Sequence, residues 1–96
     1  HTTIAGMDAV AAFRRWADRI GYVHLKDVDP NLGQYENPMQ SFCELGIGTI
    51  NFRGVYRVLK EAGYDGVLCV ELDHRPVCNY KSAMISRQYL HNALGL

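Results

Sequence analysis

This 96-residue sequence lacks the features that mark nucleic-acid-binding and membrane proteins. Ten basic and ten acidic residues cancel to a formal net charge of zero. The chain therefore has no basic stripe for nucleic acid and no reason to be attracted to an anionic membrane. No apolar run approaches the ~20 residues of a membrane span, and no secretory signal pattern is present. We expect no nucleic-acid partner and no membrane partner.

Cysteine is also scarce. The three cysteines, Cys43, Cys69 and Cys78, are an odd number without C-x-x-C spacing, which disfavours a disulfide framework and a structural zinc site. We interpret them as reduced thiols of a cytoplasmic protein. Cys69, inside a predicted strand, is expected to be a small buried apolar residue.

Only two segments are convincing strands, Ile20 to Lys26 and Val67 to Asp73. Apolar runs of this kind, separated by helical patterns, are typical of buried parallel strands in an α/β protein. A parallel pair alone leaves two bare edges, and the chain begins at His1 without an initiator Met. We expect a piece of something larger, or a chain that needs a partner to complete its sheet.

Three helices are predicted around the strands. Apolar spacing predicts a helix from Met7 to Ala17, and a second helix begins after Asn51 as N-cap and ends at Gly63. A third runs from about Lys81 to Leu94. The expected apolar face of the second helix is Val55, Tyr56, Leu59 and Ala62. The expected inner face of the third is Met84, Ile85, Tyr89, Leu90 and Ala93.

The order of elements is helix, strand, long loop, helix, strand, helix. The stretch from Asp27 to about Thr49 has no periodic pattern, and loops longer than ~12–15 residues are often functional. Long loops follow the strands and short turns precede them. This asymmetry fits a β/α barrel, whose chemistry lies on the loops after the strands.

Strand alternation places two metal-capable side chains on one face. Residues i and i+2 of a strand share a face, so His24 lies with Lys26, and Glu71 lies with Asp73. The aliphatic residues between them should meet the helices. An imidazole and a carboxylate that converge at the carboxyl ends of parallel strands suit a divalent cation of the Mn, Co, Mg, Fe or Zn type.

These residues also have purely structural interpretations. A lone strand histidine such as His24 is often a hydrogen-bonded core residue, and Glu71 could simply pair with Arg75 or Lys26. Their matching positions on successive strands favour one shared site, because the structural interpretation requires two separate coincidences.

The residues after His24 have two interpretations each. Lys26 could bind substrate by polarising a carbonyl or holding an anion, or it could extend to solvent. Asp27 could orient His24 as a hydrogen-bond acceptor, or only begin the loop. The Gly46-Ile47-Gly48 stretch is a weak phosphate signal, since no G-x-G-x-x-G fingerprint is present.

The segment Arg19–Val28, RIGYVHLKDV, resembles the seventh strand of xylose isomerase-like TIM barrels. Glu44–Phe52, Leu59–Gly66 and Val70-Glu71 are similar to that superfamily's approach to its eighth strand. The resemblance implies an α/β fold in which residues 1–96 form the C-terminal segment of a single TIM (β/α)8 barrel domain. That segment would hold about strands 7 and 8 with helices 6 to 8.

The resemblance also implies a site. Members of the superfamily bind a metal through a Glu, an Asp, a His and a Glu on four strands, and His24 and Glu71 match the histidine and the last glutamate. Glu71 would also be the catalytic acid/base, as the corresponding glutamate is in the sugar epimerases of this superfamily. His1 looks like a histidine that contacts substrate. The implied cofactor is a divalent ion, Mn, Co or Mg, with Zn as an alternative, and the remaining ligands would lie outside this chain.

Within the superfamily, the His-Leu-Lys-Asp run is most similar to inosose dehydratase and related sugar isomerases and epimerases. Endonuclease IV is disfavoured because residues 28–50 contain no histidine. The implied function is a metal-dependent isomerase, epimerase or dehydratase-like lyase that removes a proton alpha to the carbonyl of a sugar or inositol-derived ketone, through a metal-stabilised enediolate. The protein could form a homo-oligomer with this function. The alternative is a non-catalytic barrel fragment, or assembly module, that needs a partner.

Overall fold

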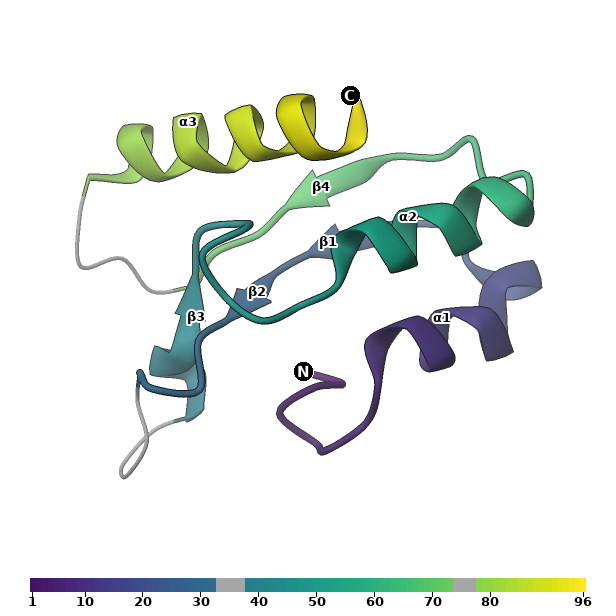
Figure 1. Ribbon diagram of the computed structural model, residues 1–96, viewed down its shortest axis with the longest axis horizontal. Helices are drawn as coiled ribbons and strands as arrows, with labels where there is room; N and C mark the ends of the chain where they lie inside the picture. The colour runs from purple at the N-terminus through teal and green to yellow at the C-terminus, as the bar shows by residue number, and fades with distance from the viewer. Residues whose placement is uncertain (33–37, 74–77) are drawn as a thin grey trace.

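The computed structural model describes residues 1–32, 38–73 and 78–96 of the chain. A parallel pair of strands, β1 (Val23–Leu25) and β4 (Leu68–Val70), is flanked by three helices. In Figure 1, α1 (Ala9–Trp16) and α2 (Phe52–Glu61) lie together beside β1, while α3 (Asn79–Tyr89) lies along β4. The element order is the predicted βαβ unit with flanking helices.

The two strands pair in parallel, with His24 opposite Cys69 and Leu25 opposite Val70. The ladder continues for one more residue, because the Glu71 N–H donates to the Leu25 carbonyl at 3.0 Å. Each strand is only three residues long, shorter than predicted. Cys69 is half-buried, although the sequence predicted a buried residue.

The core lies between β1 and the helices. Val23 and Leu25 point into it and are 2% and 4% exposed. This confirms the predicted alternation, since His24 between them faces the other way and its side chain is 53% exposed. The buried core cluster consists of Val23, Leu25, Leu45, Phe52, Val55, Leu59 and Leu90.

The helix ends follow local signals in the sequence. Asp8 caps α1 by accepting the Ala11 N–H at 2.6 Å, and a 3₁₀ turn, η1 (Ala17–Arg19), extends the helix. The predicted N-cap of α2, Asn51, accepts the Gly54 N–H at 2.9 Å.

The far end of α2 also follows its signal. Gly63 has a φ of +72° just beyond the helix, where glycine is favoured. The predicted apolar face of α2 needs two corrections: Val58 is buried, and Ala62 is exposed.

A short antiparallel ladder lies within the stretch predicted to be a loop. β2 (Asp27–Val28) pairs with β3 (Phe42–Cys43), and a 3₁₀ turn, η2 (Pro38–Ser41), leads into β3. Strands of two residues carry no periodic pattern, so nothing in the sequence indicated them. Part of the predicted loop, residues 33–37, lies outside the described residues.

The carboxylate of Asp27 joins the end of β1 to the approach to α2. The residue is 0% exposed. Its Oδ1 accepts the N–H groups of Val28 and Ile50 at 2.9 and 3.1 Å, and its Oδ2 accepts those of Gly46 and Gly48 at 2.9 and 3.1 Å. Hydrogen bonds to an ionised acceptor are the strong ones, so these four bonds hold the loop in one conformation.

Gly46 and Gly48 lie where this loop packs closely against other parts of the chain. Gly46 has a φ of +86°, and a Cβ there would overlap the Tyr89 ring. A Cβ on Gly48 would overlap the Asp27 carboxylate and the Val28 carbonyl. The G-x-G stretch is therefore explained by backbone packing around a protein carboxylate.

α3 is attached to the same loop by two buried serines. Ser82 and Ser86 are 1% and 0% exposed. The Ser82 hydroxyl donates to Glu44 Oε1 at 2.6 Å, and the Leu45 N–H donates to Ser86 Oγ at 3.2 Å. Polar contacts thus replace the apolar face that the sequence predicted for this part of the helix.

The predicted inner face of α3 is therefore only partly correct. Leu90, in the π-helical continuation η3 (Leu90–Leu94), is buried, and Tyr89 packs against the core. Met84 and Ile85, however, are 55% and 42% exposed. Apolar periodicity misplaced this face because the two buried serines point to the loop.

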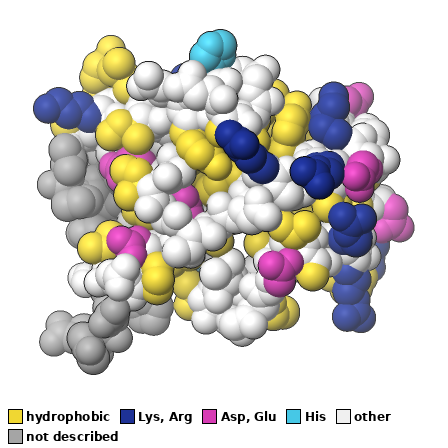
Figure 2. All heavy atoms as spheres, viewed as in Figure 1, with side chains coloured by type: hydrophobic (Ala, Val, Ile, Leu, Met, Phe, Trp, Pro, Cys, Tyr) yellow, Lys and Arg dark blue, Asp and Glu magenta, His cyan; other side chains and the backbone are white. Residues whose placement is uncertain are grey.

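Charged side chains of both signs gather where α1 and α2 end, at the right of Figure 2. There Arg14 and Glu61 form an exposed ion pair at 3.5 Å. Across the described residues, no helix is long and apolar enough to cross a membrane.

Replacing Asp27 by alanine should lower the free energy of unfolding by about 3–5 kcal/mol, because four backbone N–H groups lose the buried carboxylate that accepts them. Urea unfolding measures the change. Asp65→Ala is the matched control, since Asp65 is exposed and should cost little. Equal losses for the two variants would contradict the anchoring role of Asp27.

Replacing Gly48 by alanine should destabilise the protein by about 1–3 kcal/mol, because the new methyl group overpacks against the buried carboxylate. Gly21→Ala is the control, because a Cβ at Gly21 meets nothing within 4 Å. Thermal unfolding compares the two. A Gly48→Ala variant as stable as Gly21→Ala would refute the packing argument.

Candidate functional site

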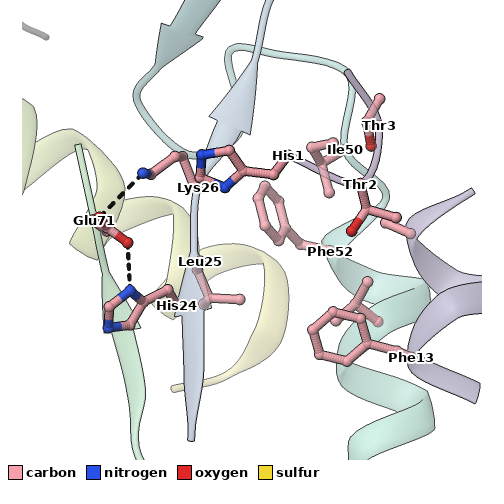
Figure 3. A pocket seen from close by; sticks show the side chains of 12 residues that line it. His1, Thr2, Thr3, Phe13, His24, Leu25, Lys26, Ile50, Phe52 and Glu71 are labelled. Atoms are coloured by element: carbon pink, nitrogen blue, oxygen red, sulfur yellow. Dashed lines mark ion pairs between the residues drawn. The ribbon is translucent and has the colours of Figure 1, made fainter. Parts of the chain in front are cut away.

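His24 and Glu71 contact each other at the carboxyl ends of the paired strands. The His24 side chain leaves β1 on the face opposite the core, and Glu71 directly follows β4. Glu71 Oε2 contacts His24 Nδ1, as Figure 3 shows. The structure therefore brings together the two residues that strand alternation placed on one face.

Lys26 lies against the same glutamate. Its Nζ is 3.1 Å from Glu71 Oε1 and 2.7 Å from Asp73 Oδ2. Its side chain is only 6% exposed. Burial alone would lower the pKa of Lys26, but the hydrogen bonds to Asp73 and Glu71 outweigh burial and raise the pKa. The ammonium group therefore stays charged at neutral pH.

These contacts revise two expectations about the residues after His24. Lys26, predicted as a substrate contact, gives its ammonium group to two carboxylates of the chain itself. Asp27, predicted to orient His24, instead points to the backbone N–H groups of the loop before α2. The physical reason is strand alternation: Asp27 follows Lys26 and faces the opposite way. Arg75, the other predicted partner of Glu71, lies outside the described residues.

A cavity of about 150 Å³ opens beside the His24–Glu71 pair. One end is polar, with His1, His24, Lys26 and Glu71 in its wall, as Figure 3 shows. The rest of the wall is mainly apolar and consists of Ala9, Phe13, Leu25, Ile50, Phe52 and Val55, with Thr2 and Thr3. His1, predicted to contact substrate, thus lies on the same cavity as the predicted metal ligands.

Three residues to which the sequence analysis gave no role in the site also belong to this region. Phe42 lies under Lys26 Nζ at 4.6 Å and packs edge-on against the His1 ring at 5.2 Å. Tyr22 packs edge-on against His24 at 5.3 Å, and Asp73 pairs with Lys26. Strand alternation placed Tyr22 on the face of His24 and Asp73 on the face of Glu71, whereas the position of Phe42 depends on the β2–β3 ladder.

The described residues provide only part of the donor set that a metal ion needs. Among the described residues, no group of three or more His, Cys, Asp or Glu side chains is arranged to hold an ion. His24 and Glu71 provide one imidazole nitrogen and one carboxylate, donors that suit divalent transition metals. Their side chains are 53% and 35% exposed, so further ligands could reach them.

A family model described as xylose isomerase-like TIM barrel matches residues 1–90. The chain belongs to the xylose isomerase-like TIM barrel family. The predicted fold, α/β and part of a TIM barrel, is confirmed. In such barrels the chemistry lies at the carboxyl ends of the strands, and in this chain Lys26 and Glu71 directly follow β1 and β4.

Relatives in this family include proteins named inosose dehydratase. The one from Lacticaseibacillus casei is 28% identical over 100% of this chain and 36% of its own length. The protein from Geobacillus thermodenitrificans is 31% identical, and the match again covers 100% of this chain and 36% of that protein. The protein from Yersinia enterocolitica is also 31% identical, and the match covers 91% of this chain and 33% of that protein. The chain thus spans only about a third of the length of these relatives, for example 36% of the protein from Lacticaseibacillus casei. No solved structure matches it.

Proposed function

We propose that this chain supplies part of the active site of a metal-dependent barrel enzyme that acts on a sugar or inositol-derived ketone. The observation that carries the proposal is the contact between His24 and Glu71 at the carboxyl ends of adjacent parallel strands. Membership of the xylose isomerase-like family and the names of the relatives support it. The chain would form the C-terminal segment of the single barrel domain.

His24 and Glu71 would hold the divalent cation, with Mn, Co or Mg expected and Zn as an alternative. The remaining ligands would come from residues outside this chain. When bound, such a cation polarises a ketone oxygen and acidifies the neighbouring C–H bond. The imidazole and carboxylate would otherwise stay in contact with each other, as they are here.

Glu71 would carry the proton. A carboxylate at hydrogen-bond distance from the acidified C–H can remove its proton and later return it. Return to the other face or to the neighbouring carbon gives an epimer or an isomer. If the proton instead goes to the hydroxyl on the adjacent carbon, that group leaves as water and gives the dehydrated product. The relatives' name favours dehydration.

His1 and the cavity wall would hold the substrate. The His1 ring is fixed against Phe42 and faces the cavity beside Lys26 and Glu71. An imidazole there can exchange hydrogen bonds with substrate hydroxyl groups. The apolar part of the wall, including Leu25 and Phe52, excludes water from the reacting carbon.

A non-catalytic assembly module is the second candidate. One observation favours it: among the described residues, His24 and Glu71 are not joined by a third metal-binding side chain. Under this alternative the protein would form a stable oligomer without turnover. The cytoplasmic location and the homo-oligomer remain predictions.

Glu71→Gln should lower kcat at least 100-fold, because an amide cannot accept the substrate proton. The full-length protein would be assayed with inosose and a panel of ketoses in the presence of Mn²⁺. Circular dichroism should show an unchanged fold. Glu61→Gln is the matched control, since Glu61 lies exposed at the end of α2. An active Glu71→Gln variant would rule out the acid/base role.

A further inference from the structure

The proposed chemistry makes no use of the ion pair between Lys26 and Asp73. Lys26 Nζ is closer to Asp73 Oδ2, at 2.7 Å, than to Glu71 Oε1, at 3.1 Å. Asp73 lies two residues after Glu71 in the segment that follows β4. The pair therefore lies directly against the proposed metal-binding carboxylate.

The Lys26 ammonium group is fully committed within the chain. It has three N–H groups to donate, and it has three partners: Glu71, Asp73 and the face of the Phe42 ring at 4.6 Å. Only 6% of the side chain is exposed. Lys26 is thus suited to fix Glu71 in place, whereas a substrate contact would need a free donor.

A fixed ammonium group beside a proposed cation site has an electrostatic cost. Two like charges a few ångströms apart repel strongly at the dielectric of a protein surface. Lys26 alone would therefore oppose a divalent ion at Glu71. Asp73 supplies the compensating negative charge, so that Lys26 can hold Glu71 while the pair adds no net charge to the site.

We propose that Lys26 and Asp73 are positioning residues that act as a charge-compensated pair, fixing the Glu71 carboxylate while leaving it available to a divalent cation. The inference rests on the proposed function, in which Glu71 and His24 bind the cation. The two members of the pair have different roles, because Lys26 holds the carboxylate and Asp73 cancels the charge that Lys26 brings.

The test is a titration of the metal-free, full-length protein with Co²⁺ alone, followed by its visible absorption. Asp73→Asn should weaken Co²⁺ binding on the order of tenfold, because the ammonium charge is no longer compensated. Adding Lys26→Met to that variant should restore the affinity to within about threefold of the wild type, because both charges are then removed.

The restoration is the decisive result, since damage to the fold would make the double variant worse than the single one. An Asp73→Asn variant with unchanged affinity, or a double variant that does not recover, would overturn the inference. If Lys26→Met does not fold, Lys26→Gln takes its place. Asp65→Asn and Lys60→Met are matched controls, because both residues are exposed and lie outside the cavity wall.

A His24→Ala variant separates this inference from the proposed function. If the wild type does not bind Co²⁺, or if His24→Ala binds it equally well, the proposed metal site itself is wrong. If His24→Ala loses binding but the Asp73 and Lys26 variants do not behave as described, only the charge-compensated pair is wrong.

Discussion

The buried carboxylate of Asp27 is the constraint on which this segment depends. A carboxylate without solvent is costly unless its oxygens are satisfied, and Asp27 is satisfied by four backbone N–H groups. Those N–H groups converge only if the loop wraps around the carboxylate. Gly48 leaves room for the carboxylate itself, and Gly46 allows the positive φ and the close approach of the Tyr89 ring. The same loop leads into the capped start of α2 and presents Glu44 and Leu45 to the serines of α3.

This anchor also fixes the position of the candidate site. Asp27 immediately follows Lys26, and the two side chains point to opposite sides of the chain. Holding Asp27 in the loop therefore holds Lys26 against Glu71 and Asp73. The β2–β3 ladder adds Phe42, which packs against both Lys26 and His1. The unusual stretch after β1 is thus a support for the polar end of the cavity.

Much of the fold could be predicted because its signals are local. The Asn51 cap and the Gly63 end of α2 depend on residues within one turn of the helix, and strand alternation alone placed His24 opposite the core. The family resemblance supplied the barrel, since two strands and three helices do not specify one.

The parts that could not be predicted depend on contacts between distant residues. Asp27 reaches backbone groups about twenty positions later, with Ile50 the farthest at 23, and no pattern in the sequence marks such an acceptor. The buried side of α3 is set by Ser82 and Ser86, whose partners lie 38 and 41 positions away. Periodicity predicts that polar residues are exposed, although hydrogen bonds can bury them.

His24 and Glu71 are expected to bind one cation, and the function proposed for this chain depends on it. The most direct test is anomalous X-ray scattering from crystals of the full-length protein grown with Mn²⁺ or Co²⁺. We expect an anomalous peak at about 2.0–2.3 Å from both a His24 ring nitrogen and a Glu71 carboxylate oxygen. A site without such a peak, with His24 and Glu71 still in contact with each other, would contradict the account.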